Sequence, residues 1–397
     1  MGSRHNKPGV KYKVDFINSG YRRYWEKHGR NVIALIEDCY ARGEFVLRKP
    51  LFDFEKNLCK FLGVKHALGV ASGTDALRIA YRAANIVKHG RDILPGDEII
   101  TVSHTFIAPI EEIVHLGAKP VLVDVGQDAL MDVKMLGKAI TKKTIGIVPV
   151  HLSGKVCDMR AINKLARKHG LWVVEDACQA LGAKQNGKMA GTLSDAGCFS
   201  FIAPKTLGAG GDGGGIVTNN IKIAERCALL RNHSNITQGV LHGYQPEAPK
   251  KMLWGYNSRL DCTMAVALDY KLTRAYKGML ARRRKICLRY LKEFSDLPMT
   301  LPTTQEGQIY QEMIIRVDDS WKFKDFMDRQ GIETLVRDTT PNHVIYSWYF
   351  GDIHLPVTES LADSCVRLPC YPEMTDSEVN QVVRAVRSYY AQQVLWA

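Results

Sequence analysis

Short apolar runs alternate with helical patterns along the first half of the chain. Four of the seven runs are rich in Val and Ile without polar alternation, which is typical of strands covered on both faces. The runs lie at 67–71, 98–102, 120–125, 145–150, 171–175, 197–201 and 214–218. Helical spacing predicts helices before and between them, at 30–41, 51–63, 75–88, 107–117 and 159–168. This order predicts an α/β fold with a mostly parallel seven-stranded sheet, and ligands are expected beyond the carboxyl ends of its strands.

The pattern changes near residue 256, where a smaller C-terminal α+β domain is predicted. It would begin with one long helix and end with an amphipathic helix, with two strands and a helix between them. These elements are expected at 262–297 and 377–393 for the outer helices, 308–317 and 332–336 for the strands, and 322–329 for the middle helix. The chain is thus divided into an N-terminal segment (1–29), a large domain (30–255) and a small domain (256–397). Residues 231–255 show no periodicity and are expected to form a long functional loop.

Composition narrows the classes of function. The net charge of +13 would attract polyanions, but no RNA-binding motif or zinc-finger spacing accompanies it, so no nucleic-acid partner is expected. None of the ten cysteines forms a C-x-x-C pair, and His104, His233 and His242 lack metal-ligand spacing, so no metal is assigned. Without a signal-peptide core or a run of 18 apolar residues, the protein is expected to be cytoplasmic and not membrane-spanning.

A possible phosphate site follows the first predicted strand. Ser72-Gly73-Thr74-Asp75 would open a helix, whose free N–H groups and nearby hydroxyls suit an anion. An ordinary capped turn explains the same residues.

Two carboxylates and an amide lie at the end of the fifth predicted strand, in Glu175-Asp176-Ala177-Cys178-Gln179. An acid at this position could pair with a cationic ring nitrogen. The alternative is an aspartate that caps the following helix. His151, at the end of another predicted strand, is interpreted as a structural histidine or as a residue at the rim of the site.

The most informative stretch places Lys205 just before six glycines within residues 208–215. A lysine in a desolvated setting can attack carbonyls as a neutral amine and form Schiff bases. The lysine precedes the glycines, which excludes a Walker A loop. A surface lysine beside a flexible loop is the alternative.

Together, a phosphate cradle, an acid for a pyridinium nitrogen and a lysine for an aldehyde are what pyridoxal 5'-phosphate (PLP) requires. Several stretches also resemble the sugar aminotransferases of the DegT/DnrJ/StrS family, which are fold-type I PLP enzymes. These are SGTDAL, DEIITVSHTFIAPI, GAKPVLVDV, PVHLSG, VVEDACQALGA, GTLSDAGCFSFIAPKTLGAGGDGG, LRNHS, GYNSRLD and RLPCYPEMTD, in the family's order across roughly residues 30–390.

The resemblance implies a role for each matching residue. Lys205 would form the Schiff base with the cofactor and shuttle the proton, and Asp176 would pair with the pyridine nitrogen. The remaining expected cofactor contacts are Gln179 to the ring hydroxyl, Phe106 on the ring face, Gly73, Thr74 and Ser200 on the phosphate, and Asn257 on the phosphate of the neighbouring subunit in a homodimer.

The resemblance also implies a reaction, in which glutamate donates its amino group to a dTDP- or UDP-linked 3-keto or 4-keto sugar in amino-sugar biosynthesis. Three alternatives stay open: a non-nucleotide ketone such as a cyclitol, a PLP sugar dehydratase, and a PLP-binding regulator without turnover. The dehydratases have histidine in place of the lysine, so Lys205 argues against that reading. Residues 336–341 replace a His-Tyr-Pro-type segment of the family's substrate site, which leaves the sugar open.

Overall fold

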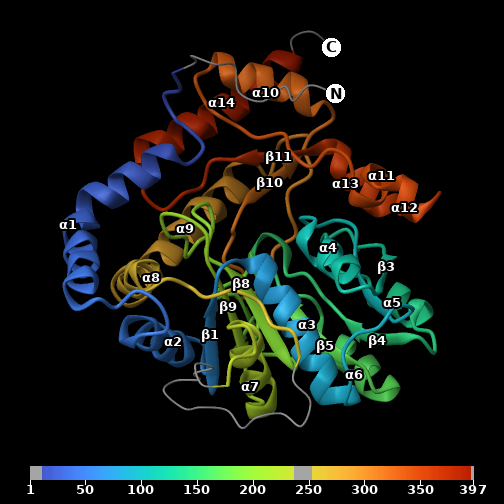
Figure 1. Ribbon diagram of the computed structural model, residues 1–397. Coiled ribbons are helices and arrows are strands. Elements are labelled where there is room, and N and C mark those ends of the chain that lie inside the picture. The colour runs from blue at the N-terminus through green and yellow to red at the C-terminus, as the bar shows by residue number, and fades with distance from the viewer. Residues whose placement is uncertain (1–10, 237–252, 395–397) are drawn as a thin grey trace.

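The central element is a seven-stranded sheet (Figure 1). The computed structural model describes residues 11–236 and 253–394. The strand order is β1-β9-β8-β5-β4-β2-β3, and β9 alone runs antiparallel to its neighbours. The strands are β1 (His66–Val70), β2 (Glu98–Val102), β3 (Lys119–Val123), β4 (Thr144–Ile147), β5 (Trp172–Asp176), β8 (Ala196–Ser200) and β9 (Gly214–Thr218). The predicted fold class and all seven runs are confirmed.

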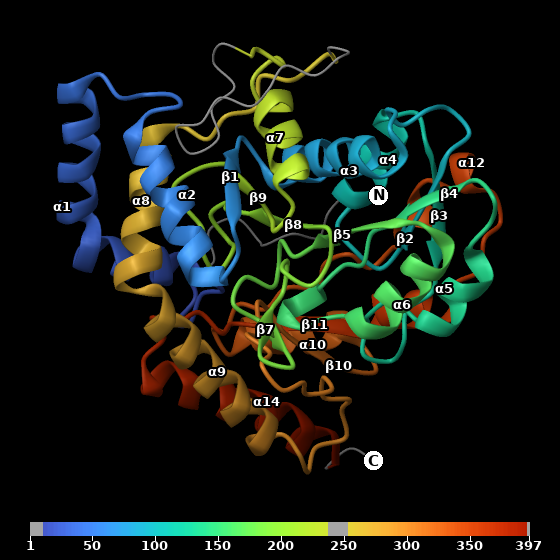
Figure 2. The same ribbon diagram turned by 90° about the horizontal axis from the view of Figure 1, so that it is seen from below.

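Helices cover both faces of this sheet, as Figure 2 shows from below. One face packs against α3 (Gly73–His89), α4 (Ala108–His115) and α7 (Ile221–Leu230). The other packs against α2 (Lys49–Leu62), α5 (Val133–Ala139), α6 (Met159–His169) and α8 (Cys262–Arg274). Burial on both sides explains why the strands lack polar alternation.

The position of β9 explains why one of the glycines after Lys205, Gly214, must be a glycine. Gly214, its first residue, pairs with Val70 on one side and Ser200 on the other. A Cβ atom at Gly214 would lie 2.1 Å from the Ser72 carbonyl oxygen, so no larger residue fits there. The ends of β1 and β8 are thereby held against the start of α3.

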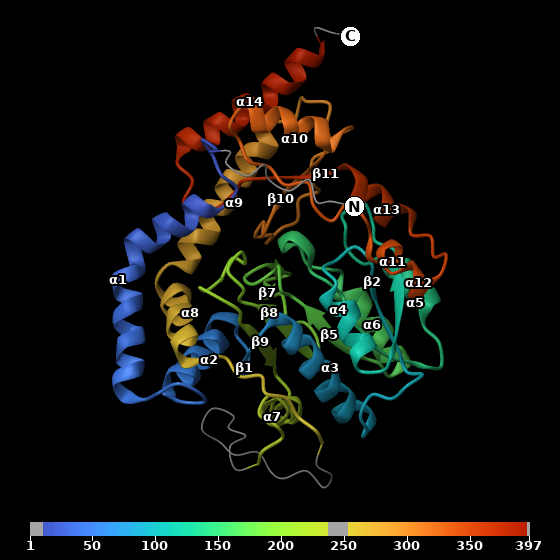
Figure 3. The same cartoon turned by 45° about the horizontal axis from the view of Figure 1, so that its top comes forward.

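The C-terminal part of the chain forms a second layer above the sheet (Figure 3). Its strands β10 (Met313–Arg316) and β11 (Cys365–Leu368) pair antiparallel. They pack with α9 (Tyr276–Glu293), α10 (Ser320–Arg329) and α14 (Asp376–Val394) around a core that includes Tyr290, Phe323 and Val382. Helix α8 packs on the sheet, whereas α9 belongs to this second core. The predicted start of the small domain at residue 256 lies before α8 and stays a prediction.

Several predicted boundaries are wrong. The expected helix at 262–297 is two helices, α8 and α9, which meet at Ala275 with φ −121° and ψ −31°. The expected strand at 332–336 makes only isolated bridges, Val14 to Ile332 and Leu335 to Arg367. The strand at 308–317 is reduced to β10. Helix α1 (Asn18–Arg42) begins twelve residues before the expected start at residue 30.

The sequence pattern also left some elements unassigned. These are α5, α7, β11, the turn η1 (Leu152–Gly154), the hairpin β6 (Lys184–Gln185) and β7 (Lys188–Met189), and the helices α11 (Asn342–Ile345), α12 (Ser347–Phe350) and α13 (Pro356–Ser364). Most of the loop expected at 231–255 lies outside the described residues, which resume at 253. Within the described ranges, no helix is long and apolar enough to cross a membrane.

Candidate active site

The start of α3 forms one wall of the candidate site. Ser72 caps the helix by accepting a hydrogen bond from the Asp75 N–H at 3.0 Å, so the capped turn exists. A Cβ atom at Gly73 would lie 2.7 Å from Ser200 Cβ and 3.2 Å from Cys178 Sγ. The turn therefore also brings Gly73 and Ser200 together, beside the residues that follow β5. The first N–H groups of a helix have no partner within it, and such an end suits a phosphate.

Asp176 is the last residue of β5 and is buried. Its backbone is held on both sides, because its N–H donates to the Pro149 carbonyl at 2.9 Å and its carbonyl accepts from the His151 N–H at 2.9 Å. One carboxylate oxygen accepts from the Cys178 N–H at 3.1 Å. No helix begins directly after Asp176, because the next element is the hairpin strand β6, so the interpretation of Asp176 as a helix cap is wrong. The carboxylate lies at the carboxyl edge of the sheet, next to Cys178.

Lys205 lies in the turn after β8 and is half-buried. Among the described residues its amine makes no hydrogen bond or ion pair, but its charge acts on groups from two directions. It opposes burial and Asp176, which together raise the pKa of the Cys178 thiol well above its usual value. It also helps to lower the pKa of Glu312, whose burial acts in the opposite direction and which Arg367 and Arg337 affect more strongly. The Lys205 charge thus acts on groups at the end of β5 and on Glu312, and the residue is half-buried, which the surface-lysine alternative does not explain.

The match to known proteins covers nearly the whole chain. The model of the DegT/DnrJ/EryC1/StrS aminotransferase family matches residues 27–387. The chain belongs to this family.

Two curated relatives and one solved structure give the degree of similarity. A dTDP-3-amino-3,4,6-trideoxy-alpha-D-glucose transaminase of Micromonospora megalomicea subsp. nigra is 34% identical, over 92% of this chain and 96% of the relative. A pleiotropic regulatory protein of Geobacillus stearothermophilus is also 34% identical, with the same coverage. The crystal structure of S. venezuelae DesV in complex with a ketimine intermediate has a TM-score of 0.85 and 32% identity, over 96% of this chain and 98% of that one. The predicted family is thus confirmed, and the chain is an aminotransferase.

Gln179 follows Asp176 closely in the sequence of this aminotransferase. Its side-chain oxygen accepts a hydrogen bond from the Ser153 N–H at 3.0 Å. This contact fixes the amide so that its NH₂ group is the part left to donate to a ligand. The geometry is compatible with the expected contact to a ring hydroxyl.

Phe106 and Asn257 are both exposed. Phe106 is 66% exposed, in the loop between β2 and α4. Asn257 pairs through its backbone with Asn232, and its neighbour Ser258 accepts from the Ala71 N–H at 3.1 Å beside the phosphate turn. Exposure leaves both side chains available, so stacking by Phe106 and a contact from Asn257 to a second subunit stay predictions.

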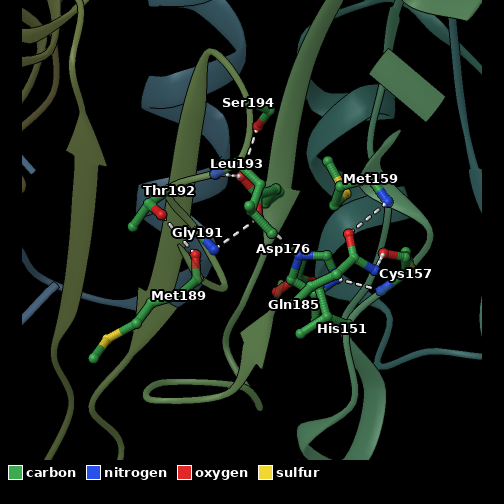
Figure 4. Close-up of polar contacts among 12 residues, drawn as sticks. His151, Cys157, Met159, Asp176, Gln185, Met189, Gly191, Thr192, Leu193 and Ser194 are labelled. Atoms are coloured by element: carbon green, nitrogen blue, oxygen red, sulfur yellow. Dashed lines mark hydrogen bonds and ion pairs between the residues drawn. The ribbon is translucent and has the colours of Figure 1, made fainter. Parts of the chain in front are cut away.

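His151 is structural, and the rim alternative is wrong (Figure 4). The side chain is fully buried and both ring nitrogens have partners: the Cys157 N–H at 3.2 Å and Glu175 at 2.9 Å. Glu175 is also fully buried, and it accepts further bonds from the turn at 191–194. Adjacent carboxylates on a strand point to opposite faces, so only Asp176 is left for the site.

Sequence reasoning missed a group of charged residues from the C-terminal part. Arg367 on β11 contacts Glu312 at 3.0 Å and Asp338 at 2.8 Å, and Arg337 contacts Glu312 at 2.6 Å. Two of them, Arg337 and Asp338, fall in residues 336–341, the segment predicted to differ from the family's substrate site. This cluster therefore occupies the region expected to shape the substrate site. The only signal in the sequence was the predicted difference from the family at 336–341.

The residues brought together fit PLP. A side chain at Gly73 would collide with Ser200, so only glycine fits at this position. Because glycine has no side chain, its backbone N–H can approach a phosphate closely. Asp176 offers an anionic oxygen, and Lys205 offers an amine without a hydrogen-bond partner among the described residues. A phosphate, a ring nitrogen and an aldehyde each have a chemically matched group.

Proposed function

We propose that this aminotransferase moves an amino group from glutamate to the keto carbon of a nucleotide-linked 3-keto or 4-keto sugar, with PLP bound between α3, β5 and the Lys205 turn. The observation that carries the proposal is that Gly73 lies against Ser200 and Cys178, and that the Cys178 N–H donates to the Asp176 carboxylate at 3.1 Å. Lys205 follows in the turn that leaves β8 at Ser200. The sugar class is supported by the 34% identical relative, which is named for a dTDP-linked amino sugar.

Each residue has one task in this proposal. When bound, PLP supplies an aldehyde that accepts the amino group and a ring that withdraws electrons from the reacting carbon. The Lys205 amine holds the aldehyde carbon and then moves a proton at the substrate carbon. Asp176 keeps a proton on the ring nitrogen, and Gln179 donates to the ring hydroxyl. The remaining assignments are the Gly73 and Thr74 N–H groups and the Ser200 hydroxyl on the phosphate, Phe106 on the ring face and Asn257 from a second subunit.

The partners and location belong to the same proposal. A homodimer would bring Asn257 of one subunit to the phosphate of the other. All ten cysteines are free thiols, which supports a reducing, cytoplasmic compartment. The regulatory name of one relative favours the alternative of a regulator without turnover. The lysine argues for chemistry, because binding alone does not require a covalent link.

The test is the visible absorption spectrum of the purified protein, recorded before and after glutamate and then with a panel of dTDP-, UDP- and GDP-linked keto sugars. We expect the Schiff-base band of bound PLP, its loss with glutamate and its return with one nucleotide class. Reduction with borohydride should place the cofactor on Lys205 by peptide mass. Lys205→Ala should abolish turnover, whereas Lys222→Arg on the exposed end of α7 should not. Retained transamination in Lys205→Ala, or no band with added PLP, would contradict the proposal.

A further inference from the structure

The peptide groups on both sides of Lys205 are held by one side chain from the C-terminal part of the chain. The Gln311 amide nitrogen donates to the Pro204 carbonyl at 3.0 Å. The Thr206 N–H donates to the Gln311 amide oxygen at 3.0 Å. We propose that Gln311 is a positioning residue that sets the direction of the Lys205 side chain, an inference that rests on the proposed function of Lys205.

Gln311 is itself held firmly. It is buried, and its backbone carbonyl accepts a hydrogen bond from Arg283 Nη1 at 3.0 Å. The same nitrogen of Arg283 lies 3.6 Å from Cys370 Sγ, after β11. The backbone of Gln311 is therefore held by α9, and through Arg283 it is linked to the segment after β11. A backbone held in this way keeps the side-chain amide in one position against the turn.

Other contacts to the turn act further along the chain. The Thr206 hydroxyl and the Tyr276 hydroxyl lie 2.7 Å apart, and the Lys271 amine donates to the Gly208 carbonyl at 2.9 Å. These contacts restrain residues after the lysine. Among the described residues, Gln311 alone binds the backbone on both sides of Lys205, so it restrains the two peptide planes between which the side chain leaves the backbone.

The direction of the side chain matters because the amine must reach a single carbon atom. A misplacement of about 1 Å can cost roughly 10²-fold in rate. The lysine side chain already has several rotatable bonds. Rotation of the peptide groups on either side of Lys205 would add to the range of positions that its amine can reach. A glutamine suits the task because one amide both donates and accepts. Glutamate of the same length would accept from Thr206 but would face the Pro204 carbonyl with a second acceptor.

The chain offers a matched control in Gln305. Its amide makes the same two-sided contact with one residue of another loop: it accepts from the Val156 N–H at 2.7 Å and donates to the Val156 carbonyl at 2.8 Å. Gln305 and Gln311 belong to the same segment before β10. Gln305→Met removes two backbone contacts without touching the Lys205 turn.

The experiment compares Gln311→Met and Gln305→Met as holoenzymes and as apoproteins. In the holoenzyme, Gln311→Met should lower kcat by about 10- to 100-fold in both half-reactions, with a much smaller change in KM for glutamate. In the apoprotein, hydrogen exchange of peptides spanning 202–209 should rise, and Gln305→Met should leave both measurements near those of the unchanged protein. Gln311→Glu keeps the contact from Thr206 but turns a second acceptor toward the Pro204 carbonyl, so its kcat should fall as well. Gln311→Leu replaces the methionine variant if that one fails to fold.

Equal losses of kcat in the two methionine variants would overturn the positioning role, since they would indicate a general effect on folding. Unchanged exchange and kcat in Gln311→Met would overturn it as well. Failure of the proposed function has a different signature: borohydride would not attach the cofactor to Lys205 in the unchanged protein, whatever the exchange of the turn.

Discussion

The ring of His151 donates a hydrogen bond from Nε2 to Glu175 at 2.9 Å, with both side chains fully buried. The donor is assigned from the other nitrogen, because Nδ1 accepts from the Cys157 N–H and therefore carries no proton. Glu175 thus receives four donors, from His151, Gly191, Leu193 and Ser194. This pair anchors the backbone directly before Asp176.

Glu175→Gln should therefore destabilise the protein strongly. A carboxamide has one acceptor oxygen, so its NH₂ group would face donors inside a buried site. We expect the free energy of unfolding to fall by about 3 kcal/mol or more, measured by urea unfolding of the apoprotein. Glu306→Gln, at an exposed position, is the control. A loss no greater than in that control would show that the four contacts are not needed.

Asp176→Asn should separate folding from chemistry. Asparagine keeps an oxygen for the Cys178 N–H, so the fold should persist, but it removes the negative charge proposed to keep the ring nitrogen protonated. We expect kcat to fall by roughly 10²-fold or more, with the cofactor still bound, by single-turnover kinetics. Asp158→Asn, at the cap of α6, should have little effect, because asparagine caps a helix equally well. A kcat close to that of the unchanged enzyme would remove Asp176 from the mechanism.

The strands could be predicted closely because burial on both faces leaves continuous apolar runs, as at 98–102 and 214–218, where predicted and observed ends agree. The break between α8 and α9 could not be predicted. Ala275 is a good helix former, and only tertiary packing separates two helices there. Residues 332–336 have the apolar texture of a strand but pair only through isolated bridges.

The candidate site was predictable where local motifs carry the chemistry, as for Lys205 before its glycines and Asp176 at the end of a strand. Gln311 had no such signal. It lies 106 positions from Lys205 in the sequence, and a buried glutamine in a loop shows no periodicity. Contacts of this kind are set by how the two parts of the chain pack, which no local pattern encodes.

His104 should make stability depend on pH in the mildly acidic range. Burial, and then Arg367, lowers its pKa to about 4, while Asp338 and Asp124 oppose this and Lys155 adds to it. The unfolded chain binds a proton at this residue below about 6.5, whereas the folded protein resists it. The contribution of His104 is therefore unfavourable to the fold as pH falls from about 6.5 to about 4, and constant below that.

His104→Gln should remove this contribution. We expect the drop in unfolding free energy between pH 7 and pH 4 to be smaller by about 2 kcal/mol than in the unchanged protein, by urea unfolding at each pH. His169→Gln, at an exposed position, should leave the drop unaltered. An identical pH dependence in His104→Gln would mean that His104 has the same pKa in the folded and the unfolded chain.

Asp124, after β3, fastens α13 to the sheet-bearing part of the molecule. Its carboxylate accepts from the Thr358 hydroxyl at 2.7 Å, the Thr358 N–H at 2.9 Å and the Val357 N–H at 3.0 Å. Burial raises the pKa of Asp124, but these contacts and the Val125 N–H outweigh it, so the pKa is lowered overall. The stabilisation is present above the unfolded value of about 3.9 and is lost as pH falls through the lower folded value.

Asp124→Asn should loosen α13, because its NH₂ group would meet N–H donors in place of an anionic oxygen. At pH 7 we expect a loss of about 2 kcal/mol in unfolding free energy and faster hydrogen exchange of the peptide spanning 355–364. The difference from the unchanged protein should shrink as pH falls from about 3.9 through the lower folded pKa of Asp124, where the folded protein also becomes protonated. Asp352→Asn, exposed in the segment before α13, is the control. A difference that stays the same at low pH would show that the charge of Asp124 does not hold α13, and that shape alone accounts for the docking.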